Sequence, residues 1–377
     1  MATKLIQNKL KRLESKEWTK GEFSKQNWGV WMHSISSYVG RIKPSFAHFL
    51  IDIFSEKNDL VLDPFCGIGT IPLEADNMGR KTIANDLNPY ATIITKAKFE
   101  RRGLSDEIEY LKSFKLPELK IETEDVPEWV KIFYHPKTLD EILKVRKKLV
   151  EDKRFFLLGC LLGIIHGHRP SHLSMRTGYI IPYIPKPVPK AEYREVVPRL
   201  INKAKRMYSD PIPPITHGKV LSCDASNLDI KKDSVDLVIS SPPYYHTLDY
   251  VHSNRLRLWF AGVDFNNQKT LSETLIQQRN TYLSSMKKVG IELSRVLKND
   301  GLCVFILGDV HLSAKKTLNT ADDISKIYEE IGFKTHAIVS DEIPPSRTTI
   351  VKYKGNEGIS SKKTKLDRIL VMSKDGS

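Results

Sequence analysis

Cysteine is scarce in this sequence, and none of it is arranged to bind a metal. The 377 residues include four cysteines, and no two of them form a Cys-x-x-Cys pair. The sequence therefore indicates neither a zinc site nor a disulfide framework, and we expect no bound metal. Isolated cysteines are typical of a reducing compartment, so we expect a cytoplasmic protein.

Long apolar segments are also absent. The longest, residues 155–165, is too short to cross a bilayer and predicts a buried helix. The N-terminus is rich in lysine and lacks the apolar core of a secretory signal. We therefore expect a protein without a membrane partner.

Basic residues, in contrast, are abundant. Lysine and arginine number 59 against 45 aspartates and glutamates, which gives a formal net charge of +14. A positive excess of this size favours association with a polyanion, and nucleic acid is the expected partner. The hydrophobic share of 40% is that of an ordinary globular protein with a sizeable core.

Strand and helix signals alternate in the first and last thirds of the chain. Residues 60–62 predict a buried strand, followed by a glycine-containing turn, a helix to about residue 78 and a strand at 81–86. This order predicts an α/β fold with a doubly wound, Rossmann-like sheet. A helix is also predicted at 321–331, and further strands at 219–224, 234–240, 301–307, 335–339 and 368–372.

The middle of the chain has a different pattern. Residues 139–149 and 155–167 predict helices, and a proline-rich run follows at 182–189. The first 25 residues are polar and charged, and we expect them to form a flexible or weakly helical arm. We therefore divide the chain into an N-terminal arm with the first part of the sheet domain, a largely helical insertion, and the remainder of the sheet domain (residues 1–110, 111–215 and 216–377).

A glycine turn lies where the first predicted strand ends. Asp63 begins the sequence Asp-Pro-Phe-Cys-Gly-Ile-Gly-Thr, in which Gly67 and Gly69 allow a ligand to approach the backbone closely. The turn lacks the full Gly-x-Gly-x-x-Gly spacing, so a dinucleotide is not favoured. Asp86 and Asp224 end the next two predicted strands, where the first could accept hydrogen bonds from ribose hydroxyls and the second from an adenine amino group.

The segment from Asp63 to Thr70 resembles the first motif of the S-adenosylmethionine-dependent amino-methyltransferases. In that family, acids at the places of Asp86 and Asp224 hold the ribose and the adenine of the cofactor. Residues 33–44 are similar to a further cofactor motif, which helps to enclose the methionine end. The resemblance implies S-adenosyl-L-methionine as cofactor, bound by Asp63, Phe65, Cys66, Gly67, Gly69, Thr70, Asp86, Leu87, Asp224, Ala225 and Ser241.

Ser241-Pro242-Pro243-Tyr244 follows the strand predicted at 234–240 and is the candidate catalytic loop. Its two prolines fix their own φ angles and remove two backbone donors, which leaves a stiff loop with outward-facing carbonyls. The amino group of a nucleobase is a poor nucleophile, because its lone pair is delocalised into the ring. Hydrogen bonds from that group to the Ser241 hydroxyl and the Pro242 carbonyl would let the nitrogen attack the sulfonium methyl in line. Tyr244 offers a face on which a flipped base could stack.

The first residue of this loop bears on the substrate. In the family that the chain resembles, Ser-Pro-Pro-Tyr is typical of DNA cytosine-N4 methyltransferases, whereas Asp or Asn in first place is typical of adenine-N6 and RNA enzymes. Cytosine-C5 chemistry needs a Pro-Cys nucleophile in the loop, and no cysteine lies there. The leading hypothesis is a site-specific DNA cytosine-N4 methyltransferase of a restriction–modification system, with a restriction endonuclease as its cognate partner.

Two alternatives stay open. The first is an amino-methyltransferase for another base, such as a DNA adenine-N6 enzyme or a tRNA guanine-N2 enzyme. The second is a non-catalytic DNA-binding protein on the same scaffold, against which the intact Asp63, Asp86, Asp224 and Ser241 argue.

Polar and basic side chains crowd the end of the apolar helix predicted at 155–167. Arginines there could contact phosphates, while serine or histidine could contact bases. Together with two residues after the catalytic loop and an arginine on the helix expected behind it, the candidate nucleic-acid contacts are Arg169, Ser174, Arg176, Tyr245, His246 and Arg255.

Overall fold

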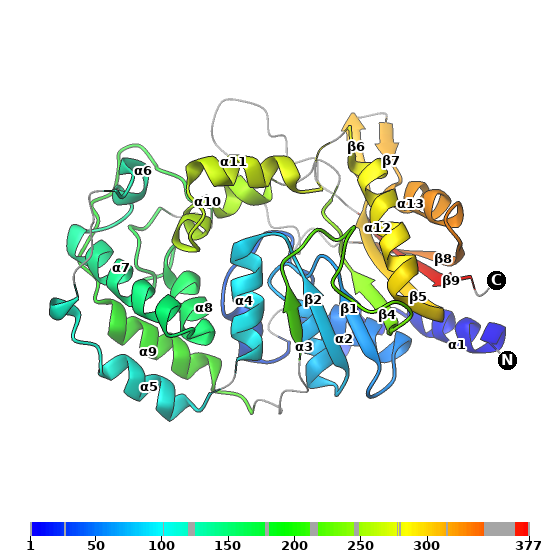
Figure 1. Cartoon of the computed structure of the whole chain (residues 1–377), viewed down its shortest axis with the longest axis horizontal. Coiled ribbons are helices and arrows are strands. Elements are labelled where there is room, and N and C mark those ends of the chain that lie inside the picture. Colours follow the sequence, from blue (N-terminus) through cyan, green and yellow to red (C-terminus); the bar gives the residue numbers. More distant parts are fainter. Residues whose placement is uncertain are drawn as a thin grey trace.

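A seven-stranded sheet with helices on both faces organises the chain (Figure 1). The structure is a computed structural model, and it describes residues 2–25, 28–100, 102–119, 125–177, 181–211, 218–244, 249–276, 278, 280–313, 316–342 and 366–375. The strands of this sheet are β1 Leu60–Asp63, β2 Lys81–Asn85, β3 Lys219–Leu221, β4 Val235–Ser240, β5 Leu297–Gly308, β8 Phe333–Glu342 and β9 Leu366–Lys374. A separate two-stranded ribbon consists of β6 Val310–Ser313 and β7 Lys316–Leu318.

The strand order is β3-β2-β1-β4-β5-β9-β8. Strands β1 to β5 are parallel to their neighbours, whereas β9 runs antiparallel between β5 and β8. The first five strands thus follow the order of a doubly wound sheet. The α/β, Rossmann-like fold predicted from the sequence is confirmed.

Strands β1, β4 and the second half of β5 are buried on both faces, which explains why they are almost continuously apolar. Alternate residues of β5 show this most clearly. Cys303 and Phe305 face the core beneath α12 and α13, and Val304 and Ile306 face the core beneath α2 and α3. Successive side chains along the strand point to opposite faces of the sheet and therefore pack into two different cores.

The helices of the described residues begin and end as follows. On the sheet domain they are α1 Ala2–Glu14, α2 Pro44–Phe54, α3 Thr70–Asn77, α4 Pro89–Phe99, α10 Tyr250–Phe260, α11 Phe265–Thr274, α12 Tyr282–Val296 and α13 Thr320–Glu329. In the insertion they are α5 Leu104–Lys112, α6 Glu128–Lys131, α7 Pro136–Glu151, α8 Phe155–Ile164 and α9 Val196–Met207. Single 3-10 turns are η1 Glu17–Thr19, η2 Gly21–Ser24, η3 Trp31–Ser34 and η4 Leu116–Glu118. Within the described residues, no helix has the length and apolar character that a membrane span requires.

The N-terminal segment is part of the packed structure, contrary to the flexible or weakly helical arm that we predicted. Helix α1 packs against α2 and β8. Leu13 and Trp18 are buried, and the Trp18 indole donates a hydrogen bond of 3.3 Å to Asp341. Because that partner lies 323 residues further along the chain, no local signal could have predicted the contact.

The inserted helices pack beside the sheet domain and share a core with it. In Figure 1 they gather next to α4, on the side of β3. Phe156 and Leu161 of α8 belong to the same apolar cluster as Ile94 of α4 and Leu256 of α10. Helix α5 begins at Leu104, a few residues before the boundary that we predicted for the insertion. The insertion is therefore continuous with the helices that follow β2 and the candidate catalytic loop.

Candidate active site

A pocket opens at the carboxyl ends of β1, β2 and β4. Its empty volume is about 940 Å³, including the part that is open to solvent. This is the edge of the sheet at which ligands bind in doubly wound folds. It is lined by most of the predicted cofactor-binding residues, namely Asp63, Phe65, Cys66, Gly67, Thr70, Asp86, Leu87, Asp224, Ala225 and Ser241.

Gly67 and Gly69 shape the turn between β1 and α3. Both have a positive φ, of 51° and 69°, which disfavours residues that carry a Cβ. A Cβ on Gly69 would lie 2.8 Å from the Thr95 hydroxyl of α4, and that hydroxyl donates a hydrogen bond of 3.1 Å to the Gly67 carbonyl. Gly67 therefore lines the pocket, whereas Gly69 lies behind it and allows α4 to approach.

Asp86 closes the turn from the end of β2. One of its carboxylate oxygens accepts a hydrogen bond from the Gly67 N–H, and the other accepts one from the Asn88 N–H, each at 2.8 Å. Burial raises the pKa of this carboxyl to about 6. Each oxygen retains a lone pair, so Asp86 can also accept hydrogen bonds from a ligand that carries two neighbouring hydroxyls.

Asp63 is buried at the same edge, at the end of β1. Its carboxylate accepts hydrogen bonds from the Ser240 hydroxyl at 2.6 Å and from the Phe65 N–H at 3.2 Å. The residue is only 2% exposed, and this burial raises the pKa of its carboxyl to about 7. The bond to Ser240 joins the end of β1 to the end of β4, directly before the candidate catalytic loop.

Asn85 links the turn after β1 to the residues after β3. Its side-chain oxygen accepts the Cys223 N–H at 3.1 Å, and its amide donates to the carbonyls of Cys223 at 3.0 Å and Pro64 at 3.2 Å. The backbone carbonyl of Asn85 accepts the Cys66 N–H at 2.9 Å. Sequence reasoning missed this residue, although its place directly before Asp86 was a usable signal.

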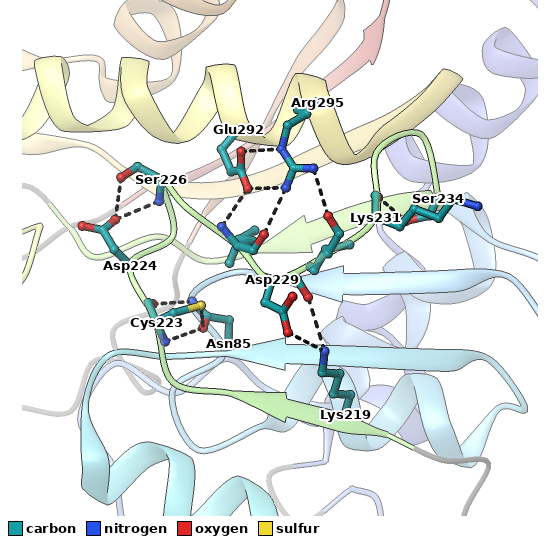
Figure 2. Close-up of polar contacts among 12 residues, drawn as sticks. Asn85, Lys219, Cys223, Asp224, Ser226, Asp229, Lys231, Ser234, Glu292 and Arg295 are labelled. Carbon is teal, nitrogen blue, oxygen red and sulfur yellow. Dashed lines mark hydrogen bonds and ion pairs between the residues drawn. The ribbon is translucent and has the colours of Figure 1, made fainter.

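Asp224 lies at the exposed rim of the pocket, on the loop after β3 (Figure 2). One of its oxygens accepts hydrogen bonds from the N–H and the hydroxyl of Ser226, both at 2.8 Å. Further along, α12 anchors the loop, since Arg295 donates to the Leu228 carbonyl at 3.0 Å and Glu292 accepts the Leu228 N–H at 2.7 Å. Helix α12 therefore helps to place Asp224 at the rim.

The predicted catalytic loop follows β4 and reaches the pocket. Ser241 and Pro243 line it, whereas Pro242 is buried and Tyr244 is half-buried outside the lining. The Tyr244 hydroxyl donates a hydrogen bond of 3.2 Å to Asp367 of β9. Tyr245 and His246, which we predicted to contact the substrate, lie outside the described residues.

The segment at 33–44, singled out from the sequence, also contributes to the pocket through Tyr38 and Arg41. The Tyr38 ring stacks on that of Tyr250, the first residue of α10, with centroids 6.0 Å apart and planes inclined by 25°. Tyr250 lines the pocket too, and no local sequence signal pointed to it.

Buried hydrogen bonds fix this segment to α3. Burial lowers the pKa of His33 to about 4, so the ring is neutral near pH 7. The His33 ring lies 2.6 Å from Glu74, whose other oxygen lies 3.0 Å from His48. Burial opposes the charge on Glu74, but the two histidines hold its pKa down to about 2. Among the described residues, no group of histidine, cysteine, aspartate or glutamate side chains is placed to hold a metal ion. The Arg41 guanidinium donates to the His33 carbonyl, so the contact between His33 and Glu74 also bears on the position of Arg41.

The candidate nucleic-acid contacts that the structure describes do not line the pocket. Arg169 and Arg176 are exposed on the loop after α8. Ser174 of the same loop is fully buried, and its hydroxyl is paired with His166 at 3.1 Å, so it is not open to a nucleic acid in this structure. Arg255 of α10 donates to the Pro182 carbonyl and thereby joins α10 to the insertion.

A family model matches the first quarter of the chain. The DNA methylase family model covers residues 4–96. That segment contains the glycine turn, Asp86 and residues 33–44, but not the loop at Ser241. A curated relative, the Type II methyltransferase M.MjaII of Methanocaldococcus jannaschii, is 27% identical over 129 residues, or 34% of this chain. The match spans only 22% of the length of that relative.

Several solved structures are similar over part or most of the chain. A putative DNA modification methylase from Thermus thermophilus, complexed with S-adenosyl-L-methionine, is 21% identical over 41% of this chain and 52% of its own, with a TM-score of 0.26. A SAM-dependent methyltransferase from Methanosarcina mazei covers 87% of this chain and 98% of its own at 9% identity, with a TM-score of 0.38. These scores are low, so the fold assignment rests on the strand order of the chain itself.

Proposed function

We propose that this protein is an S-adenosylmethionine-dependent DNA methyltransferase that modifies the exocyclic N4 amino group of cytosine. The observation that carries the proposal is the shared pocket, to which the glycine turn, Asp86 and Ser241 all contribute. A cofactor site and a candidate catalytic loop thereby meet at one edge of the sheet. The match to the DNA methylase family model and the similarity to a Type II methyltransferase support the same reading.

The geometry of the pocket suits a nucleoside cofactor. Asp86 is free to accept the two ribose hydroxyls, because its backbone bonds use only part of its acceptor capacity. Asp224, at the rim, would accept the adenine amino group. The Arg41 guanidinium would pair with the carboxylate of the methionine end, a contact that a planar cation makes well.

Methyl transfer then needs positioning more than acid–base chemistry. The target amino group would donate one hydrogen to the Ser241 hydroxyl and one to the Pro242 carbonyl, which turns the nitrogen lone pair toward the sulfonium methyl. A carbon–nitrogen bond forms as the carbon–sulfur bond breaks, and S-adenosylhomocysteine leaves. The extra proton on nitrogen is lost after the transfer, so no strong base is required.

The choice of DNA and of cytosine rests on the first residue of the loop, Ser241, and on the resemblance described above. Exposed Arg169 and Arg176 would contact phosphates, and α10 would relay the position of the insertion to the catalytic loop. A modification enzyme of this kind would act beside a restriction endonuclease of the same specificity.

The decisive experiment identifies the methylated nucleoside. The protein is incubated with methyl-labelled S-adenosylmethionine and either plasmid DNA or total tRNA, and the products are digested to nucleosides and separated. We expect label in N4-methylcytosine from DNA. Label in N6-methyladenine would correct the base, and label only in tRNA would overturn the assignment to DNA.

A further inference from the structure

Two tyrosines bring aromatic rings to the pocket beside the candidate catalytic loop. Tyr38, from the segment at 33–44, and Tyr250, the first residue of α10, both line the pocket, as Ser241 does. Their rings stack with centroids 6.0 Å apart and planes inclined by 25°, an offset arrangement that aromatic pairs favour. The pocket therefore has an aromatic wall in addition to the acids at the strand ends.

The two rings have different neighbours. A Cβ on Gly67 would lie 3.4 Å from the Tyr38 ring, so Tyr38 lies against the glycine turn. Tyr38 also has a ring contact with the buried Tyr90 of α4, with centroids 6.1 Å apart. Within the described part of the chain, Tyr250 has no ring neighbour besides Tyr38. One face of Tyr250 is therefore left for a planar ligand in the pocket.

Tyr244, the aromatic residue of the candidate catalytic loop itself, is placed differently. It is half-buried and does not belong to the pocket lining. Its hydroxyl donates to Asp367 of β9 at 3.2 Å, which ties the side chain to the last strand of the sheet. The structure therefore favours another residue for the stacking face that the sequence assigned to Tyr244.

Tyr250 is held by the helix that it begins. Asp249 caps α10 by accepting the His252 N–H at 2.8 Å. The Asn254 side chain, which is buried, donates to the Tyr250 carbonyl at 2.9 Å. The first turn of α10 is therefore fixed at the backbone on which the Tyr250 ring is carried.

Arginine side chains tie α10 as a whole to the insertion. The buried Arg257 donates to the His166 carbonyl at 2.9 Å, and Arg255 donates to a carbonyl further along the insertion. In the opposite direction, Arg146 of α7 donates to the Phe260 carbonyl at the end of α10 at 2.6 Å. The insertion thereby sets the position of α10, and with it the position of the ring at its start.

We propose that Tyr250 is a substrate-binding residue, on whose ring the target base stacks while Ser241 holds the amino group. The inference rests on the proposed function, because it requires a base that is extruded into this pocket. Such a base has lost its neighbours in the duplex, and stacking on an aromatic ring replaces them. Tyr38 supports this ring from the side of the glycine turn.

The stack can be tested without any methyl transfer. DNA that contains 5-iododeoxycytidine in place of deoxycytidine forms a covalent bond, under long-wavelength ultraviolet light, with an aromatic residue that stacks on the iodinated base. The protein is irradiated with this DNA and S-adenosylhomocysteine, and the cross-linked peptides are identified by mass spectrometry. We expect a cross-link at Tyr250. Its absence in DNA that the protein binds, or a cross-link at Tyr244 instead, would overturn the inference.

Loss of the ring should affect the use of DNA rather than of cofactor. Tyr250→Ala should lower kcat/KM for plasmid DNA roughly 10-fold or more, because the stacking of the base is lost. The Kd for S-adenosylmethionine should stay within about 3-fold of the wild type, since Tyr38 is the ring that contacts the glycine turn. Tyr250→Phe keeps the ring and should retain most of the activity. Phe265→Ala removes an exposed ring at the start of α11, outside the pocket lining, and is the matched control.

The outcomes separate this inference from the proposed function. If the wild-type protein methylates no nucleic acid, the proposed function fails, whereas the cross-link still decides whether a base reaches Tyr250. If the wild type is active and Tyr250→Ala keeps full kcat/KM, only the role of Tyr250 is overturned. Equal losses in Tyr250→Phe and Tyr250→Ala would contradict it as well, because they would assign the effect to the hydroxyl and not to the ring.

Discussion

The side-chain amide of Asn85 pairs with both backbone groups of Cys223, accepting from its N–H at 3.1 Å and donating to its carbonyl at 3.0 Å. It thereby continues the contact between β2 and β3 beyond the last paired residues of the ladder. The same amide reaches Pro64 in the turn after β1. A buried side chain thus ties together the three segments that carry Asp63, Asp86 and Asp224.

Replacing this amide should loosen all three segments. We expect Asn85→Ala to lower the free energy of unfolding by about 2–4 kcal/mol, because it leaves buried backbone groups without partners. Binding of S-adenosylmethionine should weaken as well. Urea denaturation and titration calorimetry measure the two effects, with the exposed Ser222→Ala on the same segment as control. A variant as stable as the wild type would show that the amide contributes little.

Replacing Gly69 by alanine should destabilise the protein more than the same change at a glycine with open space around it. Gly69→Ala combines a positive φ with a contact of 2.8 Å to Thr95, whereas Gly21, with a φ of 52°, has nothing within 4 Å of its Cβ position. Both alanine variants carry backbone strain, on the order of 1 kcal/mol, and only the first adds a steric clash. Thermal denaturation should therefore show a clearly lower Tm for Gly69→Ala than for Gly21→Ala. Equal losses would mean that α4 moves aside freely.

The pH dependence of stability should reflect the burial of Asp63. Its pKa of about 7 in the folded protein lies above its usual value, so the folded state binds more protons than the unfolded state between about pH 4 and pH 7. The free energy of unfolding should consequently fall as the pH rises through this range. Asp86 and Asp367 add to the same trend, because burial raises their pKa values too.

Asp63→Asn isolates the contribution of Asp63. The amide oxygen can still accept from Ser240 and Phe65, but it no longer titrates. We expect a shallower fall of stability with pH, and above pH 7 a gain on the order of 1–3 kcal/mol over the wild type. Urea denaturation without cofactor, at several pH values, checks both. A variant with the slope of the wild type would contradict the raised pKa.

The parts of the site that could be predicted from the sequence are those encoded by neighbouring residues. The glycine turn, Asp86 and the Ser241 loop each follow a short apolar strand, and strand ends in a doubly wound sheet meet at one edge. Asp367 and Tyr250 depend instead on where β9 and α10 pack, which their local sequences do not specify. Ser174 failed as a candidate contact for a related reason, since its burial comes from His166 and the packing of the insertion.

In the fold, too, features encoded by neighbouring residues could be predicted, whereas features that depend on distant packing could not. The β1–turn–α3–β2 unit has its own start and stop signals, and Gly79, with a φ of 78°, follows the end of its helix. The N-terminal segment has a polar composition, but Leu13 and Trp18 are buried by contacts with distant parts of the chain. Composition alone therefore predicted an arm where tertiary packing forms a helix against the sheet.

Arginines of the insertion should act on nucleic-acid binding without affecting the fold. Arg169 and Arg176 are exposed, and we expect alanine at either position to weaken DNA binding. The slope of the logarithm of the binding constant against the logarithm of the salt concentration should become shallower by about one, the share of one phosphate contact. The free energy of unfolding should change by less than about 0.5 kcal/mol. Ser174→Ala should instead lower the stability and leave DNA binding unchanged, because its hydroxyl is buried. Fluorescence anisotropy at several salt concentrations, with denaturation alongside, separates the two classes. Arginine variants that bind DNA like the wild type would place the DNA elsewhere.

The central claim is that the pocket at the ends of β1, β2 and β4 holds the methyl donor and that Ser241 presents the acceptor amino group to it. The most direct test is the rate of methyl transfer to DNA by Ser241→Ala at saturating S-adenosylmethionine. We predict a loss of roughly 100-fold or more, with the Kd for the cofactor within about 3-fold of the wild type. Full turnover would contradict the role of Ser241, and loss of cofactor binding would show that the site is misplaced.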